Sequence, residues 1–130
     1  MASLSRQLAR WITGLKFEHL PPAVVDRAKG VTLQSLSSVL IGSQTKPGRD
    51  AVKLMCEEEE GVKRGATIFV TGQKVTKGGA AFANAEMAFS GGKWDTFRML
   101  MHPGTSVPPA ALAAAEETGA SGKEIGRAHV

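Results

Sequence analysis

Side chains able to transfer protons and to bind anions are concentrated between residues 93 and 102. The chemically active members of this stretch are Lys93, Asp95, Thr96, Arg98 and His102. An imidazole changes charge near neutral pH and suits acid–base catalysis, and a carboxylate can orient it or act as the base. Guanidinium and ammonium groups bind carboxylate ligands, and a threonine hydroxyl donates a hydrogen bond. The stretch therefore predicts a site, with His102 and Asp95 as candidate catalytic residues and Thr96, Arg98 and Lys93 as candidate substrate ligands.

The same residues also have structural interpretations, which the sequence leaves open. Asp95 is equally suited to be the N-cap of a helix. His102, ahead of Pro103, is compatible with packing in a loop, and lysine and arginine side chains are commonly only solvated. Trp94 is better explained as a core or dimer contact than as a platform for a substrate. The positions of these residues relative to the neighbouring helices decide between the interpretations.

Helices on both sides of this stretch must position it. Apolar residues at helical spacing predict helices over the ranges 4–15, 21–41, 50–60, 80–90 and 110–118. Gly91 and Gly92 break the fourth helix just before the candidate site. The β-branched run 66–70, bounded by glycines, predicts one short strand. The sequence thus predicts a mainly α domain, in which the second helix is apolar around much of its surface and buried on more than one side.

Length and composition restrict the class of protein. The 130 residues, 42% of them hydrophobic, predict one domain with an aliphatic core. The formal net charge of +4 is scattered along the chain, so we expect no nucleic-acid partner. No apolar run reaches the roughly 20 residues of a membrane span, and we expect neither a membrane partner nor a secretory signal. A single cysteine favours the cytoplasm, and the separated histidines predict no metal site.

Three collinear stretches cover most of the chain and share one resemblance. The first, LARWITGLKFEHLPPAVVDRAK (8–29), has the pattern of a helix, a connector and a second helix. The second, AFANAEMAFSGGKWDT (81–96), follows the pattern A-x-A-N-G-A-x-A-H-A-L-D-F-D-D-T. The third, HPGTSVPPAALAAAEETGASGKE (102–124), begins with H-P-G and continues as a helix. In this order and spacing they resemble the N-terminal domain of the MmgE/PrpD family.

The resemblance implies a fold and an activity. The family includes 2-methylcitrate dehydratase, cis-aconitate decarboxylase and iminodisuccinate epimerase, which act on small di- and tricarboxylates without a metal or organic cofactor. The family fold is a large all-helical domain with a smaller α/β lid domain, and the full-length parent is expected to be a homodimer. The acidic stretch and the H-P histidine line the family's active site, and they correspond here to Asp95, Thr96 and His102.

Lyases of this kind remove a proton next to a carboxylate and expel water or carbon dioxide. Negative charge builds up on a carboxylate in the transition state, and cations and positioned donors stabilise it. The resemblance therefore assigns His102 to proton transfer, with Asp95 orienting it or acting as base. Arg98 and Lys93 are expected to bind substrate carboxylates, and Thr96 to donate a hydrogen bond.

The second stretch departs from the family pattern at several positions, three of which hold a histidine or an aspartate in that pattern. Phe89 occupies the place of the histidine, Gly92 that of the first aspartate and Trp94 that of the middle aspartate. These differences are compatible with a divergent subgroup of altered chemistry or with a degenerate copy. Dehydratase, decarboxylase, epimerase or isomerase, and non-catalytic truncated chain all remain alternatives for the function.

The chain also differs from the family in length. Residues 1–124 are expected to form an incomplete N-terminal helical domain, because the lid domain and further catalytic lysines have no counterpart. The last six residues, IGRAHV (125–130), resemble the translation in one frame of a common sequencing adapter. We therefore expect 125–130 not to be native to the gene, and the isolated chain to be inactive.

Overall fold

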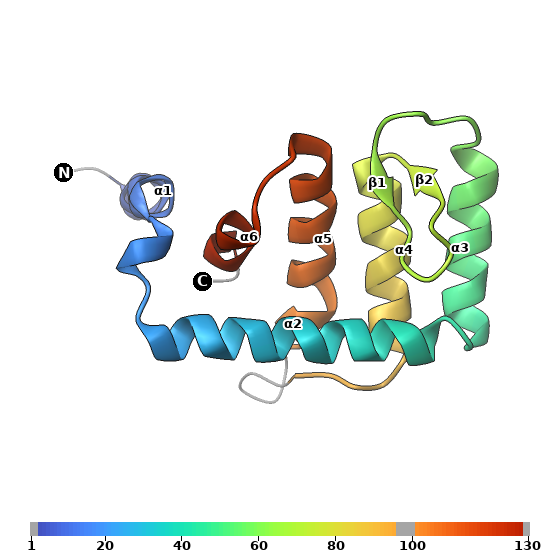
Figure 1. The fold of residues 1–130 in the computed structure, drawn as a ribbon, viewed down its shortest axis with the longest axis horizontal. Helices are drawn as coiled ribbons and strands as arrows, with labels where there is room; N and C mark the ends of the chain where they lie inside the picture. The colour runs from blue at the N-terminus through green and yellow to red at the C-terminus, as the bar shows by residue number, and fades with distance from the viewer. Residues whose placement is uncertain (1–2, 96–100, 129–130) are drawn as a thin grey trace.

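The domain is mainly α, as the sequence predicts. The computed structural model describes residues 3–95 and 101–128. The elements in chain order are α1 (Leu4–Gly14), a short 3-10 helix η1 (Phe17–His19), α2 (Pro22–Gly42), α3 (Lys46–Glu58), β1 (Ala66–Thr67), β2 (Lys74–Val75), α4 (Lys77–Ser90), α5 (Pro103–Thr118) and α6 (Gly122–Ala128) (Figure 1).

Helix α2 is the base on which the other helices are arranged. In Figure 1 it runs along the lower edge, and α3, α4 and α5 stand side by side above it. Helix α4 is central, since it packs against α2, α3 and α5. At the other end of the molecule, α6 contacts α5 and η1, and α1 lies beyond it (Figure 1).

Small residues let α4 occupy this central position. Ala80, Ala83 and Ala88 are completely buried, and Met87 fills the space between them. A Cβ atom on Gly42 of α2 would overlap the backbone of Met87, so this helix crossing depends on glycine. The alanine-rich sequence therefore encodes close packing between helices.

A two-stranded antiparallel sheet covers one end of α4. Ala66 pairs with Val75 and Thr67 with Lys74. The buried amide of Asn84 on α4 holds the hairpin: its Oδ1 accepts the Phe69 N–H at 2.8 Å and its Nδ2 donates to the Thr67 carbonyl at 3.0 Å. Two hydrogen bonds between backbone groups of the hairpin and the Asn84 side chain thus attach the hairpin to α4.

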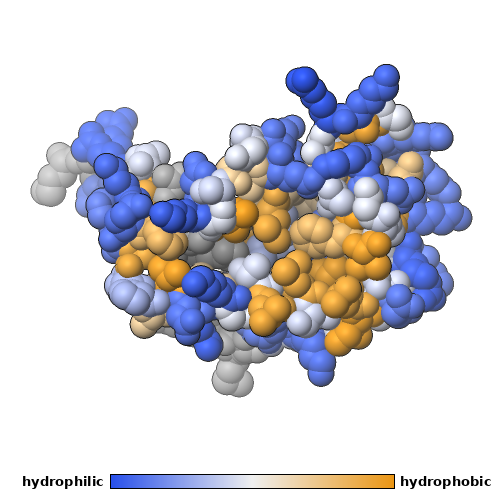
Figure 2. Space-filling model, viewed as in Figure 1, coloured by the Kyte–Doolittle hydropathy of each residue, from blue (hydrophilic) through white to orange (hydrophobic). Residues whose placement is uncertain are grey.

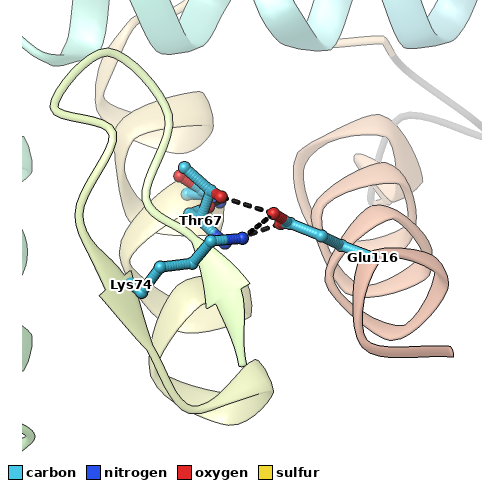
Figure 3. A network of polar contacts seen from close by, with 4 residues as sticks. Thr67, Lys74 and Glu116 are labelled. Atoms are coloured by element: carbon cyan, nitrogen blue, oxygen red, sulfur yellow. Dashed lines mark hydrogen bonds and ion pairs between the residues drawn. The ribbon is translucent and has the colours of Figure 1, made fainter. Parts of the chain in front are cut away.

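The carboxylate of Glu116 joins the hairpin to α5 (Figure 3). It accepts hydrogen bonds from the backbone N–H of Thr67 at 2.7 Å and from the Thr67 hydroxyl at 2.5 Å. It also pairs with the ammonium group of Lys74. These hydrogen bonds, that from Lys74 first, lower the pKa of the Glu116 carboxyl below its usual value.

Several element boundaries differ from the sequence prediction. Helix α3 begins at Lys46 instead of residue 50, because the Thr45 side chain caps it by accepting the Gly48 N–H. The predicted strand 66–70 is shorter, since Val70 has a positive φ of 72° in the turn that leads to β2. Helix α5 begins at Pro103 and contains Pro108 and Pro109 in its interior.

The prediction that α2 is buried on more than one side is wrong. Its buried residues are small or polar, apart from one valine: Ser35, Ser38, Val39 and Gly42. Leu33 and Leu40 on the other side are 66% and 63% exposed. Figure 2 shows hydrophobic side chains gathered over the C-terminal half of α2. Small residues on the covered side of α2 let α4 approach closely. The leucines of α2 therefore lie on its exposed side.

Candidate functional site

The segment after α4 is fastened to α2. The Ser38 hydroxyl donates to the Ala88 carbonyl at 2.6 Å and accepts the backbone N–H of Lys93 at 3.1 Å. Gly91 lies so close that a Cβ atom there would overlap the Ser38 carbonyl. Gly92 has a positive φ of 71°, which turns the chain. The segment then continues along the lower side of α2 to Asp95 (Figure 1).

Asp95 caps helix α5 from outside that helix. Its Oδ1 accepts the backbone N–H of Gly104 at 2.7 Å. A Cβ atom on Gly104 would lie 2.5 Å from this oxygen, so glycine makes room for the carboxylate. A carboxylate at a helix N-terminus satisfies a free N–H group and interacts favourably with the helix dipole. The capping interpretation of Asp95 therefore describes its side chain in this structure.

The imidazole of His102 is held by the backbone of Asp95. Its Nδ1 lies 2.7 Å from the Asp95 carbonyl oxygen. A carbonyl oxygen only accepts, so Nδ1 carries the proton and donates it. The lone pair of the neutral ring is then on Nε2. Asp95 thus orients His102, but through its backbone rather than through its carboxylate.

Aromatic rings stack beside His102. The Trp94 and Phe89 rings lie 4.8 Å apart between centroids with 18° between their planes, and the indole N–H donates to the Phe89 carbonyl at 2.6 Å. The Trp94 and His102 rings are 4.9 Å apart and tilted by 42°. Trp94 therefore contacts the candidate catalytic histidine, a role that the sequence prediction of a core or dimer contact missed.

A cavity of about 450 Å³ opens beside Asp95, between α2 and the start of α5. Its walls are largely apolar, with Val24, Val31 and Val107 among them, and Asp95 and Arg27 provide the charged groups. Sequence reasoning missed Arg27. The available signal was its spacing, because position 27 falls on the same helix face as 24 and 31.

Lys93 is the remaining candidate ligand whose position the structure describes, and it does not line this cavity. Its side chain is exposed, and its backbone N–H is what contacts Ser38. Thr96 and Arg98 lie outside the described residues. The structure therefore places His102 in contact with Asp95 and Trp94. It places Arg27 with Asp95 at the cavity, which His102 does not line. The substrate-binding roles of Thr96, Arg98 and Lys93 stay predictions.

Two features are absent from the described part of the chain. Residues 3–95 and 101–128 contain no group of three or more histidine, cysteine, aspartate or glutamate side chains placed to hold a metal ion. Within the same ranges, no helix is both long and apolar enough to cross a membrane.

Comparison with known families now identifies the domain. The family model of the MmgE/PrpD N-terminal domain matches residues 6–130. The chain belongs to the MmgE/PrpD family. Comparisons with curated proteins and with solved structures gave no match.

Two of the departures from the MmgE/PrpD pattern are spatial partners. Phe89 and Trp94 replace the histidine and the middle aspartate of that pattern, and their rings stack on each other. The two replacements therefore form one aromatic unit next to His102.

Proposed function

We propose that this MmgE/PrpD domain is part of a cofactor-independent lyase, a dehydratase or decarboxylase, that acts on small di- or tricarboxylates. One observation carries the proposal: the hydrogen bond from Nδ1 of His102 to the Asp95 carbonyl, which leaves Nε2 as a base. Membership of the MmgE/PrpD family supports the reaction class. A homodimeric, cytoplasmic full-length parent belongs to the same proposal.

In the proposed reaction, Nε2 of His102 accepts a proton from the carbon next to a substrate carboxylate. The electrons of that C–H bond form the new double bond, and the hydroxyl group leaves as water once it is protonated. In a decarboxylation, the imidazole first takes a proton from water and then donates it to the carbon from which carbon dioxide departs. The electrons of the broken C–C bond form the new C–H bond. Cations stabilise the charge on the carboxylate. Arg27 is available at the cavity, and Arg98, Lys93 and Thr96 are the further candidates from the sequence.

Two alternatives differ in what happens after the proton is removed. An epimerase or isomerase of the same family uses the same base but returns a proton to carbon without expelling a group. A non-catalytic truncated chain is favoured by a specific observation, because the Asp95 carboxylate is engaged in capping α5. For the isolated chain we propose inactivity, and for the full-length parent the lyase activity.

The test uses the full-length parent with a panel of small hydroxy-di- and tricarboxylates. We expect His102→Gln to lower turnover about 100- to 10,000-fold, the usual contribution of an acid–base group. His19→Gln is the matched control, since His19 is an exposed histidine of η1. Release of water or carbon dioxide indicates a lyase, and deuterium exchange at carbon without release indicates an epimerase. Unchanged turnover in His102→Gln would refute the assignment.

A further inference from the structure

The imidazole of His102 is in contact with two consecutive residues. The Asp95 carbonyl accepts its Nδ1–H at 2.7 Å, and the Trp94 ring lies 4.9 Å from it between centroids, tilted by 42°. The backbone of His102 is fixed as well, since its carbonyl accepts the Thr105 hydroxyl at 2.7 Å at the start of α5. The ring is therefore the remaining movable part, and residues 94 and 95 contact it.

The indole of Trp94 is itself immobilised. It stacks on Phe89 at 4.8 Å and donates its N–H to the carbonyl of the same residue at 2.6 Å. Offset stacking and an indole hydrogen bond together define both the plane and the rotation of the ring. Phe89 lies in the last turn of α4, so the indole is anchored to the central helix of the domain.

We propose that Trp94 is the positioning residue of His102: the anchored indole restricts the tilt of the imidazole so that Nδ1 stays on the Asp95 carbonyl and Nε2 stays unprotonated. This inference rests on the proposed function, in which Nε2 is the base. The χ2 torsion of histidine is broad, so a single hydrogen bond from Nδ1 leaves the ring able to tilt and to weaken that bond. The Trp94 ring, 4.9 Å away between centroids, restricts this tilt.

The proposal also explains why two departures from the family pattern occur together. A tryptophan at position 94 needs a flat partner at the end of α4, and the Phe89 ring provides it. Replacing Phe89 alone removes the ring on which the indole stacks. Replacing Trp94 alone removes the indole itself. We therefore expect Phe89→Leu to loosen His102 in the same direction as a change of Trp94.

The first test measures the tautomer of His102 in the full 130-residue chain by 15N NMR of the imidazole nitrogens, at about pH 8.5, where histidine is neutral. His19 is an internal reference of opposite type, since its Nδ1 accepts the Lys16 N–H at 3.3 Å and its Nε2 carries the proton. We expect His102 to show the Nδ1–H form, and Trp94→Leu to change it into a mixture while His19 is unaffected. Trp11→Phe on α1 is the control for loss of a tryptophan.

A second variant keeps the test decisive if Trp94→Leu fails to fold. Trp94→Phe retains a flat ring but replaces the large ring current of the indole. We expect the His102 ring-proton shifts to move in this variant and the tautomer to be retained. Unchanged His102 shifts in Trp94→Phe, or an unchanged Nδ1–H form in a folded Trp94→Leu, would overturn the proposal.

Kinetics of the full-length parent separate this inference from the proposed function. Misplacing a catalytic group by about 1 Å can cost about 100-fold in rate, so we expect Trp94→Leu to lower kcat about 10- to 100-fold with little change in KM. If His102→Gln leaves turnover unchanged while the tautomer depends on Trp94, the proposed function fails and the positioning contact stands. If His102→Gln abolishes turnover while Trp94→Leu changes neither kcat nor the tautomer, the proposed function stands and the positioning role of Trp94 fails.

Discussion

Asn84 shows how one buried side chain can hold a structural unit. Its amide provides the acceptor for the Phe69 N–H and the donor for the Thr67 carbonyl, and it is 1% exposed. Both bonds go to backbone groups of the hairpin. A hairpin with two residues in each strand has few bonds of its own, so its position depends on this amide.

We expect Asn84→Ala to destabilise the domain by about 2–4 kcal/mol, because it leaves two backbone groups without partners in the interior. Asn84→Asp keeps the acceptor for Phe69 but cannot donate to Thr67 when ionised, and should also destabilise. Urea unfolding measures the change. Gln34→Ala removes an exposed amide of α2 and should change the stability by less than about 0.5 kcal/mol. Equal effects of the two alanine variants would contradict the role of Asn84.

Glu116 predicts a pH dependence of stability. The Lys74 ammonium and the Thr67 groups lower its pKa in the folded state. A carboxyl with a depressed folded pKa stabilises the fold above its unfolded pKa of about 4.3, and this contribution disappears as the pH falls through the folded value. Because the Glu116 side chain is 34% exposed, we expect less than about 1 kcal/mol.

The measurement for Glu116 is urea unfolding between neutral and acidic pH. In Glu116→Gln the loss of stability below about pH 4.3 should be smaller than in the unmodified chain. Glu57→Gln is a matched control, since that carboxylate faces Lys53 on the exposed side of α3. A wild-type pH profile in Glu116→Gln would show that the contacts in Figure 3 do not stabilise the fold.

Part of the candidate site could be predicted from the sequence, because residue types indicate chemistry. His102 and Asp95 are recognisable as an acid–base group and a carboxylate, and the structure places them in contact. The sequence could not show that the backbone of Asp95 makes the contact, since every residue has a carbonyl. The sequence prediction also missed Arg27, which lines the cavity from α2, nearly 70 positions before Asp95.

At the scale of elements, the crossing of α2 with the end of α4 positions the site. Ser38 bonds to the Ala88 carbonyl and to the Lys93 N–H, so it spans the point where α4 ends. The two glycines between these bonds act differently. Gly91 has an ordinary φ of −71° but no space for a side chain, whereas Gly92 has space but a left-handed backbone.

These two glycines give a matched pair of variants. We expect Gly92→Ala to cost about 1–2 kcal/mol, the penalty for a left-handed alanine. Gly91→Ala should cost about 3 kcal/mol or more, because the added methyl group overlaps the Ser38 carbonyl and α2 must shift. Chemical denaturation measures both, and hydrogen exchange of the Lys93 amide should accelerate in Gly91→Ala. A larger effect at Gly92 would contradict the close approach.

Helical periodicity predicted the elements better than their orientation. The patterns over α2 and α4 located both helices, because apolar and small residues recur at the right spacing. They could not show which face of α2 is covered, since Ser35 and Ser38 look polar in sequence but fit beneath α4. The short strand β2 and the early start of α5 were missed because strand pairing and capping by Asp95 do not follow from the spacing of apolar residues.

At the scale of the whole molecule, α6 extends the packing of the domain beyond α5. The helix spans Gly122–Ala128 and so continues across position 124. Ile125 lines a cavity together with Phe17 and Leu112, a place that suits an apolar residue. Helix α6 packs against α5 and η1, and the family model extends across it.

The distribution of exposed apolar side chains leads to a prediction about association. Along α1, four large apolar residues on one side are more than half exposed: Leu4, Leu8, Trp11 and Ile12. The outward side of α2 adds Leu33 and Leu40. Neighbouring apolar side chains of this size on a monomer favour contact with another apolar surface, because burial removes them from water.

We therefore expect the isolated chain to be helical, loosely packed and increasingly associated as its concentration rises. Leu33→Lys with Leu40→Lys should reduce the association if the α2 face is responsible, and Leu8→Lys with Ile12→Lys should do so if α1 is. Gln34→Lys adds the same charge at an exposed polar position and serves as the control. Sedimentation velocity over a range of concentrations gives the mass. The prediction would be contradicted if the chain stays monomeric at all concentrations and unfolds in a sharp two-state transition. Such behaviour would mean that the domain is stable with these apolar faces exposed to water.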